Sequence, residues 1–206
     1  LGAGTLVLSG TSTPSEGVTV SGGTLLVTGS LTGDVLVNGT GTLGGTDGTI
    51  VGNITVEDGG TLSPGASVGT LYINGNVTIA SGATLYLEVE YVGDHWEADT
   101  LAFDGAHTLT FEAGANLILV NLSGDAVLQD EQIINIFGTG TVPTIEGALF
   151  GGADLTTFGR PGLSFTLDKS GVLTVVIPEP STYALLGGLG AVALALLRRR
   201  RRTSKK

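Results

Sequence analysis

The sequence predicts an all-β protein: a parallel β-helix, or solenoid, then a β-rich C-terminal section, then a single C-terminal transmembrane helix. Gly supplies 35 of the 206 residues without a collagen-like period, and Thr, Val and Leu occupy much of the space between the glycines. Such a mixture favours many short strands joined by tight turns. A recurring Gly-Thr-Leu theme and an apolar run that ends in arginines are the other two observations.

The Gly-Thr-Leu theme predicts the coils of the solenoid. It begins at Gly4, Gly23, Gly41, Gly60 and Gly69. Leu6, Leu25, Leu43 and Leu62 are separated by 19, 18 and 19 residues, a spacing typical of one solenoid coil. Apolar and polar residues alternate inside each unit, as in residues 54–56, which indicates strands with one buried face. A β-sandwich with recurring strands is the alternative, and the near-constant spacing favours the solenoid.

The pattern divides the chain into three sections. Residues 1–90 carry the repeats, residues 91–177 form a β-rich section that we expect to close the solenoid, and residues 178–206 form the tail. Alternation in the second section places Leu101 with Phe103, Leu109 with Phe111, and Leu117 with Leu119 on one face. Residues 163–177 predict a hairpin that turns at residues 168–171, and residues 138–162 are loop-like.

Charge is strongly segregated along the chain. The formal net charge is -10, and only Arg160 and Lys169 oppose the 19 carboxylates upstream of the basic tail. A body with so few cations cannot neutralise many phosphates, so we expect no nucleic-acid partner. The chain has no Cys and therefore no disulfide or thiolate site. It also has no Met, so we expect it to be a fragment or a processed product, with any signal peptide upstream of Leu1.

The tail combines a Pro-Glu-Pro, an apolar run and a block of arginines. The apolar run from Tyr183 to Leu197 would extend about 22 Å as a helix, short of the roughly 30 Å hydrocarbon core, so we expect a tight crossing aided by snorkelling arginines. The basic flank should stay cytoplasmic and leave the β-rich body outside. This flank consists of Arg198, Arg199, Arg200, Arg201 and Arg202. A buried helix of a soluble domain is the alternative, which leaves the arginine block unexplained.

Residues 58–90, which contain Gly-Thr-Leu-Ser-Pro-Gly and then a second Gly-Thr-Leu, resemble the autotransporter-associated β-strand repeat of bacterial surface and secreted passenger proteins. The resemblance implies a right-handed β-helix outside the cytoplasm and no particular activity. The C-terminal helical anchor stands where an autotransporter would have its membrane β-barrel, which disfavours a passenger of that type.

Pro178, Glu179 and Pro180, followed by the apolar run and the arginines, resemble the PEP-CTERM sorting signal of proteins exported by Gram-negative bacteria. Exosortase, an integral membrane enzyme, processes such proteins near the Pro-Glu-Pro. The resemblance implies an exosortase-type partner, anchoring in the inner membrane before processing, and a cell-surface or extracellular location afterwards. By this resemblance the chain is the substrate, and the catalytic residues belong to the processing enzyme.

Candidate chemistry is concentrated in residues 88–99, which hold five other polar groups beside His95 and Trp96. Carboxylates beside a histidine can bind a divalent cation or take part in acid-base catalysis. Asp94, His95 and Asp99 are the weak candidates for metal ligands. The favoured interpretation, however, is a solvated loop at the end of the repeats. Trp96 suits either sugar stacking or packing at a solenoid end. Weaker candidates are His107, which we expect to be exposed on a strand, and the turn acids Asp47, Glu57 and Asp58.

The sequence therefore favours a non-enzymatic, exported cell-surface or matrix protein of structural or adhesion type. We expect no cofactor, no metal and no catalytic residue in this chain, with exopolysaccharide or matrix as a further partner. The competing hypothesis is a carbohydrate-active or carbohydrate-binding β-helix protein, whose coils would bring distant acids together. The chain has few cationic residues to hold substrate carboxylates, which argues against an enzyme that acts on acidic polysaccharides.

Overall fold

The computed structural model describes residues 3–123, 133–138, 140–147, 152–154, 164–167 and 172–176. These residues are all-β, and no helix occurs among them. The chain divides into two compact units, Leu1–Val176 and Ile177–Lys206. The second unit, which contains the expected transmembrane span from Tyr183 to Leu197, lies outside the described residues. Among the described residues no helix is long and apolar enough to cross a membrane.

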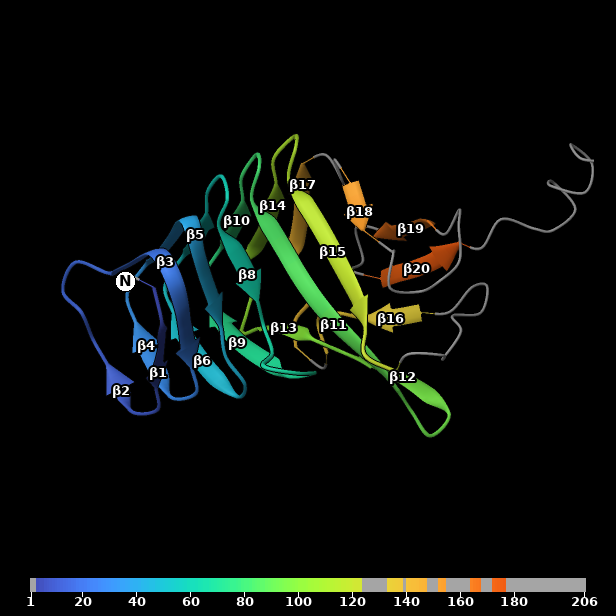
Figure 1. Ribbon diagram of the computed structural model, residues 1–206, viewed down its shortest axis with the longest axis horizontal. Coiled ribbons are helices and arrows are strands. Elements are labelled where there is room, and N and C mark those ends of the chain that lie inside the picture. The colour runs from blue at the N-terminus through green and yellow to red at the C-terminus, as the bar shows by residue number, and fades with distance from the viewer. Residues whose placement is uncertain are drawn as a thin grey trace, which may run out of the picture. The chain divides into compact units, whose positions relative to one another are not determined.

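The strands of the first unit form three sheets (Figure 1). The 12-stranded sheet contains β1 (Thr5–Leu8), β3 (Val18–Val27), β5 (Val35–Gly44), β7 (Ile54–Val56), β8 (Thr61–Ser63), β10 (Val77–Ile79), β11 (Thr84–Val92), β12 (His95–Ala98), β14 (Thr108–Phe111), β15 (Asn116–Asn121), β17 (Thr144–Gly147) and β18 (Gly152–Asp154). The 5-stranded sheet contains β2 (Thr11–Ser12), β4 (Ser30–Thr32), β6 (Gly48–Val51), β9 (Thr70–Asn74) and β13 (Thr100–Phe103). The 3-stranded sheet contains β16 (Ile133–Asn135), β19 (Ser164–Leu167) and β20 (Val172–Val176).

A ladder of leucines runs through the largest sheet along parallel strand pairs. Its members in order are Leu6, Leu25, Leu43, Leu62, Leu85 and Leu117. Each leucine lies directly beside the next across a parallel pair, and all except the first are completely buried. Leu6 is 42% exposed because β1 is the first strand of the ladder and has a partner on one side only.

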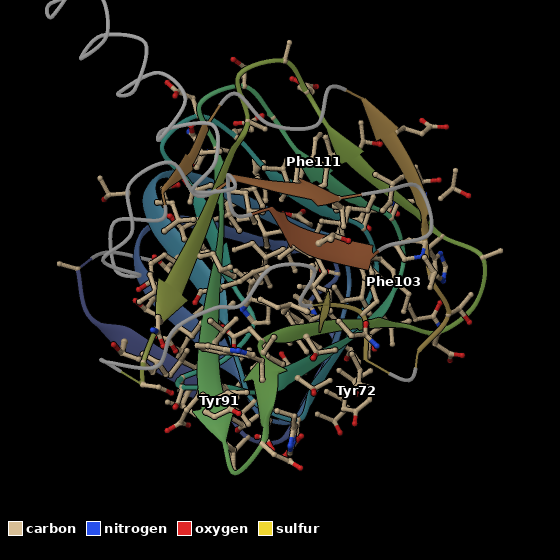
Figure 2. All side chains as sticks on the ribbon, turned by 90° about the vertical axis from the view of Figure 1, so that its right-hand side faces the viewer. Tyr72, Tyr91, Phe103 and Phe111 are labelled. Atoms are coloured by element: carbon tan, nitrogen blue, oxygen red, sulfur yellow. The ribbon has the colours of Figure 1, made fainter. Side chains whose placement is uncertain are left out.

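Two further apolar ladders contribute to the interior. One passes through Val20, Val37, Val56, Ile79 and Phe111 in the largest sheet. The other passes through Leu31, Ile50, Ile73 and Phe103 in the 5-stranded sheet. All of these side chains are buried, and Figure 2 shows the strands enclosing an interior filled with side chains. Burying aliphatic and aromatic side chains contributes about 1.5–3 kcal/mol each, so these ladders are the main source of stability.

β5 contributes to two ladders because it bends in the middle. Residues 35–37 pair with β7, and residues 42–44 pair with β8. Gly39 lies at the bend with a φ of 58°, a left-handed conformation that glycine adopts without strain. A Cβ there would lie 2.8 Å from the Ser21 carbonyl oxygen of the neighbouring strand β3. The close approach of β3 and the bend therefore both select glycine at this position.

A polar ladder follows one edge of the stack. The Asp34 carboxylate accepts a hydrogen bond from the Asn53 backbone N–H at 2.8 Å, and the Asn53 side-chain oxygen accepts from the Asn76 N–H at 3.0 Å. The Asn76 side-chain oxygen in turn accepts from the Thr108 N–H at 2.9 Å. Each side chain thus satisfies a backbone donor at the start of the neighbouring parallel strand, which fixes the register at a point where the chain turns.

The structure confirms several expectations about the strands. The pairs expected on one face of residues 101–119 are buried together, and β19 pairs antiparallel with β20 as the expected hairpin, whose turn at residues 168–171 lies outside the described residues. The same parallel ladders continue across Glu90, where the sequence expects the repeat section to end.

Two features differ from the expectation. The fifth Gly-Thr-Leu, at Gly69, leads into β9 of the 5-stranded sheet, so its Leu71 pairs with Gly48 and Leu101 and not with the leucine ladder. The expectation of a loop over residues 138–162 was wrong in part, because β17 and β18 lie there and pair parallel with β14 and β15. Pairing with β14 and β15, which local sequence cannot reveal, accounts for these short strands.

We expect Leu62→Ala to destabilise the protein by about 2–5 kcal/mol, because it leaves a cavity in the middle of the leucine ladder. Leu6→Ala is the matched control, since it removes the same atoms from an exposed member of the same ladder and should cost well under half as much. Denaturant unfolding of the two variants measures the difference. Equal losses of unfolding free energy in the two variants would contradict the burial of Leu62 between its two neighbours in the ladder.

Candidate functional site

The acidic cluster of residues 88–99 forms a hairpin that extends beyond the ladders. β11 and β12 pair antiparallel, with Val92 opposite His95 and Gly93 and Asp94 at the turn (Figure 1). Gly93 has a φ of 65°, and Gly at the first position of such a two-residue turn matches the right-handed twist of the strands. Because β15 accompanies β11 only as far as Val89, the outer part of the hairpin lies beyond this ladder.

His95 lies between two carboxylates at the tip of the hairpin. Its Nδ1 is 3.2 Å from the Asp94 Oδ1, and its Nε2 is 3.4 Å from the Glu97 Oε1. The hydrogen bond with Asp94 raises the pKa of His95 above its usual 6.5, and the charges of Asp94 and Glu97 act in the same direction. All three side chains are exposed to solvent, so these contacts favour the protonated imidazole without enclosing a site.

Two aromatic rings pack on the same hairpin. Tyr91 and Trp96 are opposite each other in the strand register, and their ring centroids lie 5.3 Å apart at an interplanar angle of 55°. This cross-strand pair stabilises the hairpin. Of the two interpretations of Trp96, the structure favours packing, although the partner is a tyrosine on the hairpin and not the end of the solenoid.

Asp99 has a different environment from the other acids of the cluster. It is completely buried, and its two carboxylate oxygens accept hydrogen bonds from the backbone N–H groups of Gly69 at 2.9 Å and Glu88 at 2.8 Å. Burial raises its pKa from 3.8 to about 7, against the lowering effect of these hydrogen bonds. A Cβ on Gly65 would lie within 2.2 Å of the Asp99 Oδ1, so glycine leaves the space that the carboxylate occupies. Asp99 thus joins the base of the hairpin to the earlier segment that contains Gly65 and Gly69.

The structure does not bring the three weak metal candidates together. Asp94 and His95 are in contact at the exposed tip, whereas Asp99 is enclosed by backbone donors at the base of the hairpin. In the part of the chain that the structure describes, no group of three or more His, Cys, Asp or Glu side chains is arranged to hold a metal ion. The sequence could not distinguish the two environments, because Asp94 and Asp99 differ in burial and not in local pattern.

The other candidates have structural roles. His107 precedes β14, and its Nε2 lies 2.8 Å from the Asp104 backbone oxygen, which closes the turn after β13. Asp47 adopts a φ of 58° in the turn before β6. The Glu57 backbone participates in hydrogen bonds with Val37 and Gly60 where the chain leaves β7. None of these positions gathers a set of ligands among the described residues.

The end of the chain matches a known sorting motif. Residues 176–202 match the PEP-CTERM protein-sorting motif. This motif implies an exported protein that is anchored transiently in the membrane and sorted by exosortase. The match includes the Pro-Glu-Pro, the apolar run and the arginine block, all of which lie outside the described residues. No curated protein matches the chain.

We expect the pKa of His95 to fall after Asp94→Asn, because the substitution removes the hydrogen-bonded charge that raises it. Glu97→Gln should lower this pKa by a smaller amount, since Glu97 has the weaker effect. The imidazole ¹H and ¹³C chemical shifts of His95, followed by NMR against pH, measure both changes. An unchanged titration after Asp94→Asn would contradict the contact at the hairpin tip.

Asp99 should make the stability of the first unit fall as the pH rises from about 4 to about 7. Its pKa is higher in the folded protein than the 3.8 of an unperturbed Asp, so folding favours the protonated carboxyl. The contribution of Asp99 to the free energy of unfolding is therefore fully present below pH 4 and is lost by pH 7. The shift corresponds to a loss of about 4 kcal/mol.

Denaturant unfolding of wild type and Asp99→Asn at pH 4 and pH 7 measures this change. The variant lacks the titrating group, so its free energy of unfolding should change less between the two pH values. The side-chain NH₂ that Asp99→Asn introduces would face a backbone N–H donor, which lowers the stability of the variant at both pH values. Asp104→Asn, at an exposed position, is the control and should retain the wild-type slope. Identical slopes for wild type and Asp99→Asn would contradict the assignment to Asp99.

Proposed function

We propose that this protein is an exported cell-surface or extracellular-matrix protein of structural or adhesion type. Its C-terminal signal directs it to an exosortase-type enzyme, which cleaves near Pro178-Glu179-Pro180. The match of residues 176–202 to the PEP-CTERM motif carries this proposal. The structural or adhesive role of the β-rich body, residues 1–177, is inferred from its stacked parallel strands and not from a catalytic site.

The apolar run from Tyr183 to Leu197 serves as the temporary anchor. Its 15 uncharged residues span roughly 22 Å as a helix, which suits a thinned or tightly matched bilayer. Arg198 to Arg202 remain on the cytoplasmic side because five adjacent guanidinium groups do not cross the hydrocarbon core. This orientation places the Pro-Glu-Pro and the β-rich body on the outer side of the inner membrane.

The body is a right-handed parallel β-helix built from autotransporter-associated β-strand repeats. Three observations support this part of the proposal: parallel ladders between successive coils, leucines stacked in register, and coils of 18 or 19 residues at the start of the chain. A stack of this kind gives a stiff body whose length grows with the number of coils. Such a body suits a spacer or a matrix component.

The proposal treats the body as non-enzymatic, and the use of its acids supports this. Asp34 and Asp99 accept hydrogen bonds from backbone N–H groups, as does Glu112, whose carboxylate accepts from the Ser81 N–H at 3.3 Å. Acids in these positions complete the hydrogen bonding of coil edges. The carboxylates at the exposed hairpin tip flank His95 and lie outside any enclosed cleft.

The proposal is tested by mass spectrometry of the mature C-terminus in the native host. We expect the mature surface protein to lack residues 198–206, and a strain without the processing enzyme to retain them in the membrane fraction. The double variant Pro178→Ala/Pro180→Ala should accumulate in the membrane, whereas Pro14→Ala, which alters a proline of the body, should be processed normally. Recovery of intact Arg198 to Lys206 on the mature surface protein would contradict the sorting proposal. The tail would then be a permanent anchor.

A further inference from the structure

A groove lies on the 5-stranded sheet. It has a volume of about 440 Å³ and is lined by residues of β6, β9 and β13 together with Asp104 and Gly140. This volume falls within the range of roughly 300–1,000 Å³ that is typical of small-molecule sites. Its floor is a regular sheet, so all of its lining residues except Asp104 and Gly140 are held by strands.

Two rows of side chains cross the groove from strand to strand. Thr49, Tyr72 and Ala102 are partners in the strand register and form the first row. Val51 and Asn74 are partners in the second row, and Asp104 extends it because its backbone N–H donates to the Ile73 oxygen at 2.9 Å. The rows combine an aromatic ring with a hydroxyl, a carboxamide and a carboxylate within one groove.

Tyr72 is the principal feature of the groove. It is 45% exposed, although a large aromatic side chain contributes most to stability when it is buried. Figure 2 shows Tyr72 at the periphery of the body, outside the filled interior. Its cross-strand neighbour is the small Ala102, so the space beside the phenol ring stays open. The ring thus offers an apolar face to a ligand beside polar groups that can hydrogen-bond to it.

One side of the groove is closed by the segment around Gly140. The Thr141 N–H donates to the Phe103 oxygen at 3.0 Å, which holds this segment against β13. A Cβ on Gly140 would lie 3.0 Å from the Phe103 nitrogen, so the backbone approaches the sheet closely. The backbone groups of β9 already pair with β6 and β13, so an added β-strand has no free edge to join here.

The charge around the groove restricts the class of ligand. All nine Lys and Arg residues of the chain lie outside the described residues, and Asp104 is the one carboxylate among the lining residues that the structure describes. A negatively charged ligand would meet the Asp104 carboxylate and would find no Lys or Arg among the described residues. A single carboxylate also lacks the partner that glycoside hydrolysis by paired acids requires.

We propose that this groove binds a segment of neutral polysaccharide. A pyranose ring has an apolar C–H face that fits the exposed ring of Tyr72, and it has hydroxyl groups around its edge. Asn74, Asp104 and Thr49 supply donors and acceptors to these hydroxyls. The groove is a binding site without hydrolytic function, and it would give the exported body a way to join a carbohydrate matrix.

Isothermal titration calorimetry with the full 206-residue chain in mild detergent tests this inference. The probes are cellohexaose, maltohexaose and mannohexaose as neutral oligosaccharides, and hexaguluronate as the anionic one. We expect at least one neutral probe to bind and the anionic probe not to bind. Binding is measured on the purified chain, so the result does not depend on how the protein is exported.

Tyr72→Ala should weaken binding about tenfold or more, whereas Tyr72→Phe should keep most of it because the ring remains. Tyr91→Ala, which removes the exposed tyrosine of the hairpin, is the matched control and should bind as wild type does. Asn74→Ala, at another exposed position of the groove, gives a second variant if Tyr72→Ala fails to fold by circular dichroism. The inference is overturned if no neutral probe binds, if Tyr72→Ala and Asn74→Ala bind normally, or if Tyr91→Ala loses as much affinity.

Discussion

The in-register stacking of apolar side chains between parallel strands is the interaction on which the rest of the structure depends. Leu43 lies beside Leu25 on one neighbouring strand and beside Leu62 on the other, and these neighbours complete the backbone hydrogen bonds of β5. A strand of the ladder therefore cannot be stable alone, because its buried face is covered by its neighbours. Leu6, which has a partner strand on one side only, is 42% exposed.

The interval between ladder leucines lengthens along the chain, and the buried side chains become larger in the same direction. The intervals between successive leucines of the ladder are 19, 18, 19, 23 and 32 residues. In the same direction the second ladder changes from valine to Ile79 and Phe111, and the third ends in Phe103, whose ring centroid lies 6.1 Å from that of Phe137. Phenylalanine rings thus occupy the interior where the intervals are longest. Part of the longest interval is the hairpin that carries His95 and Trp96.

The sequence predicts the parts of this architecture that repeat and misses those that depend on pairing over a distance. The leucine spacing was sufficient to predict which residues lie side by side in the first coils. The hairpin between Leu85 and Leu117 interrupts the period, so the sequence alone could not reveal that the ladder continues. The chemistry of Asp99 was equally hidden, because its pKa depends on burial against Gly65 and Gly69 from an earlier coil. Tyr72 gave no sequence signal, since only the register places it beside Ala102 and Thr49.

Charge segregation connects the body with its proposed route. Seven of the nine cationic residues lie in the last nine positions, whereas the described residues of the body contain none. Anionic lipids attract basic residues near the surface by about 1 kcal/mol each, so the tail has an affinity for the membrane that the acidic body lacks. Cleavage near the Pro-Glu-Pro would remove the anchor and the basic flank together. The released body would then have little attraction to an anionic surface, and an uncharged polymer is the kind of matrix that it can approach without electrostatic cost.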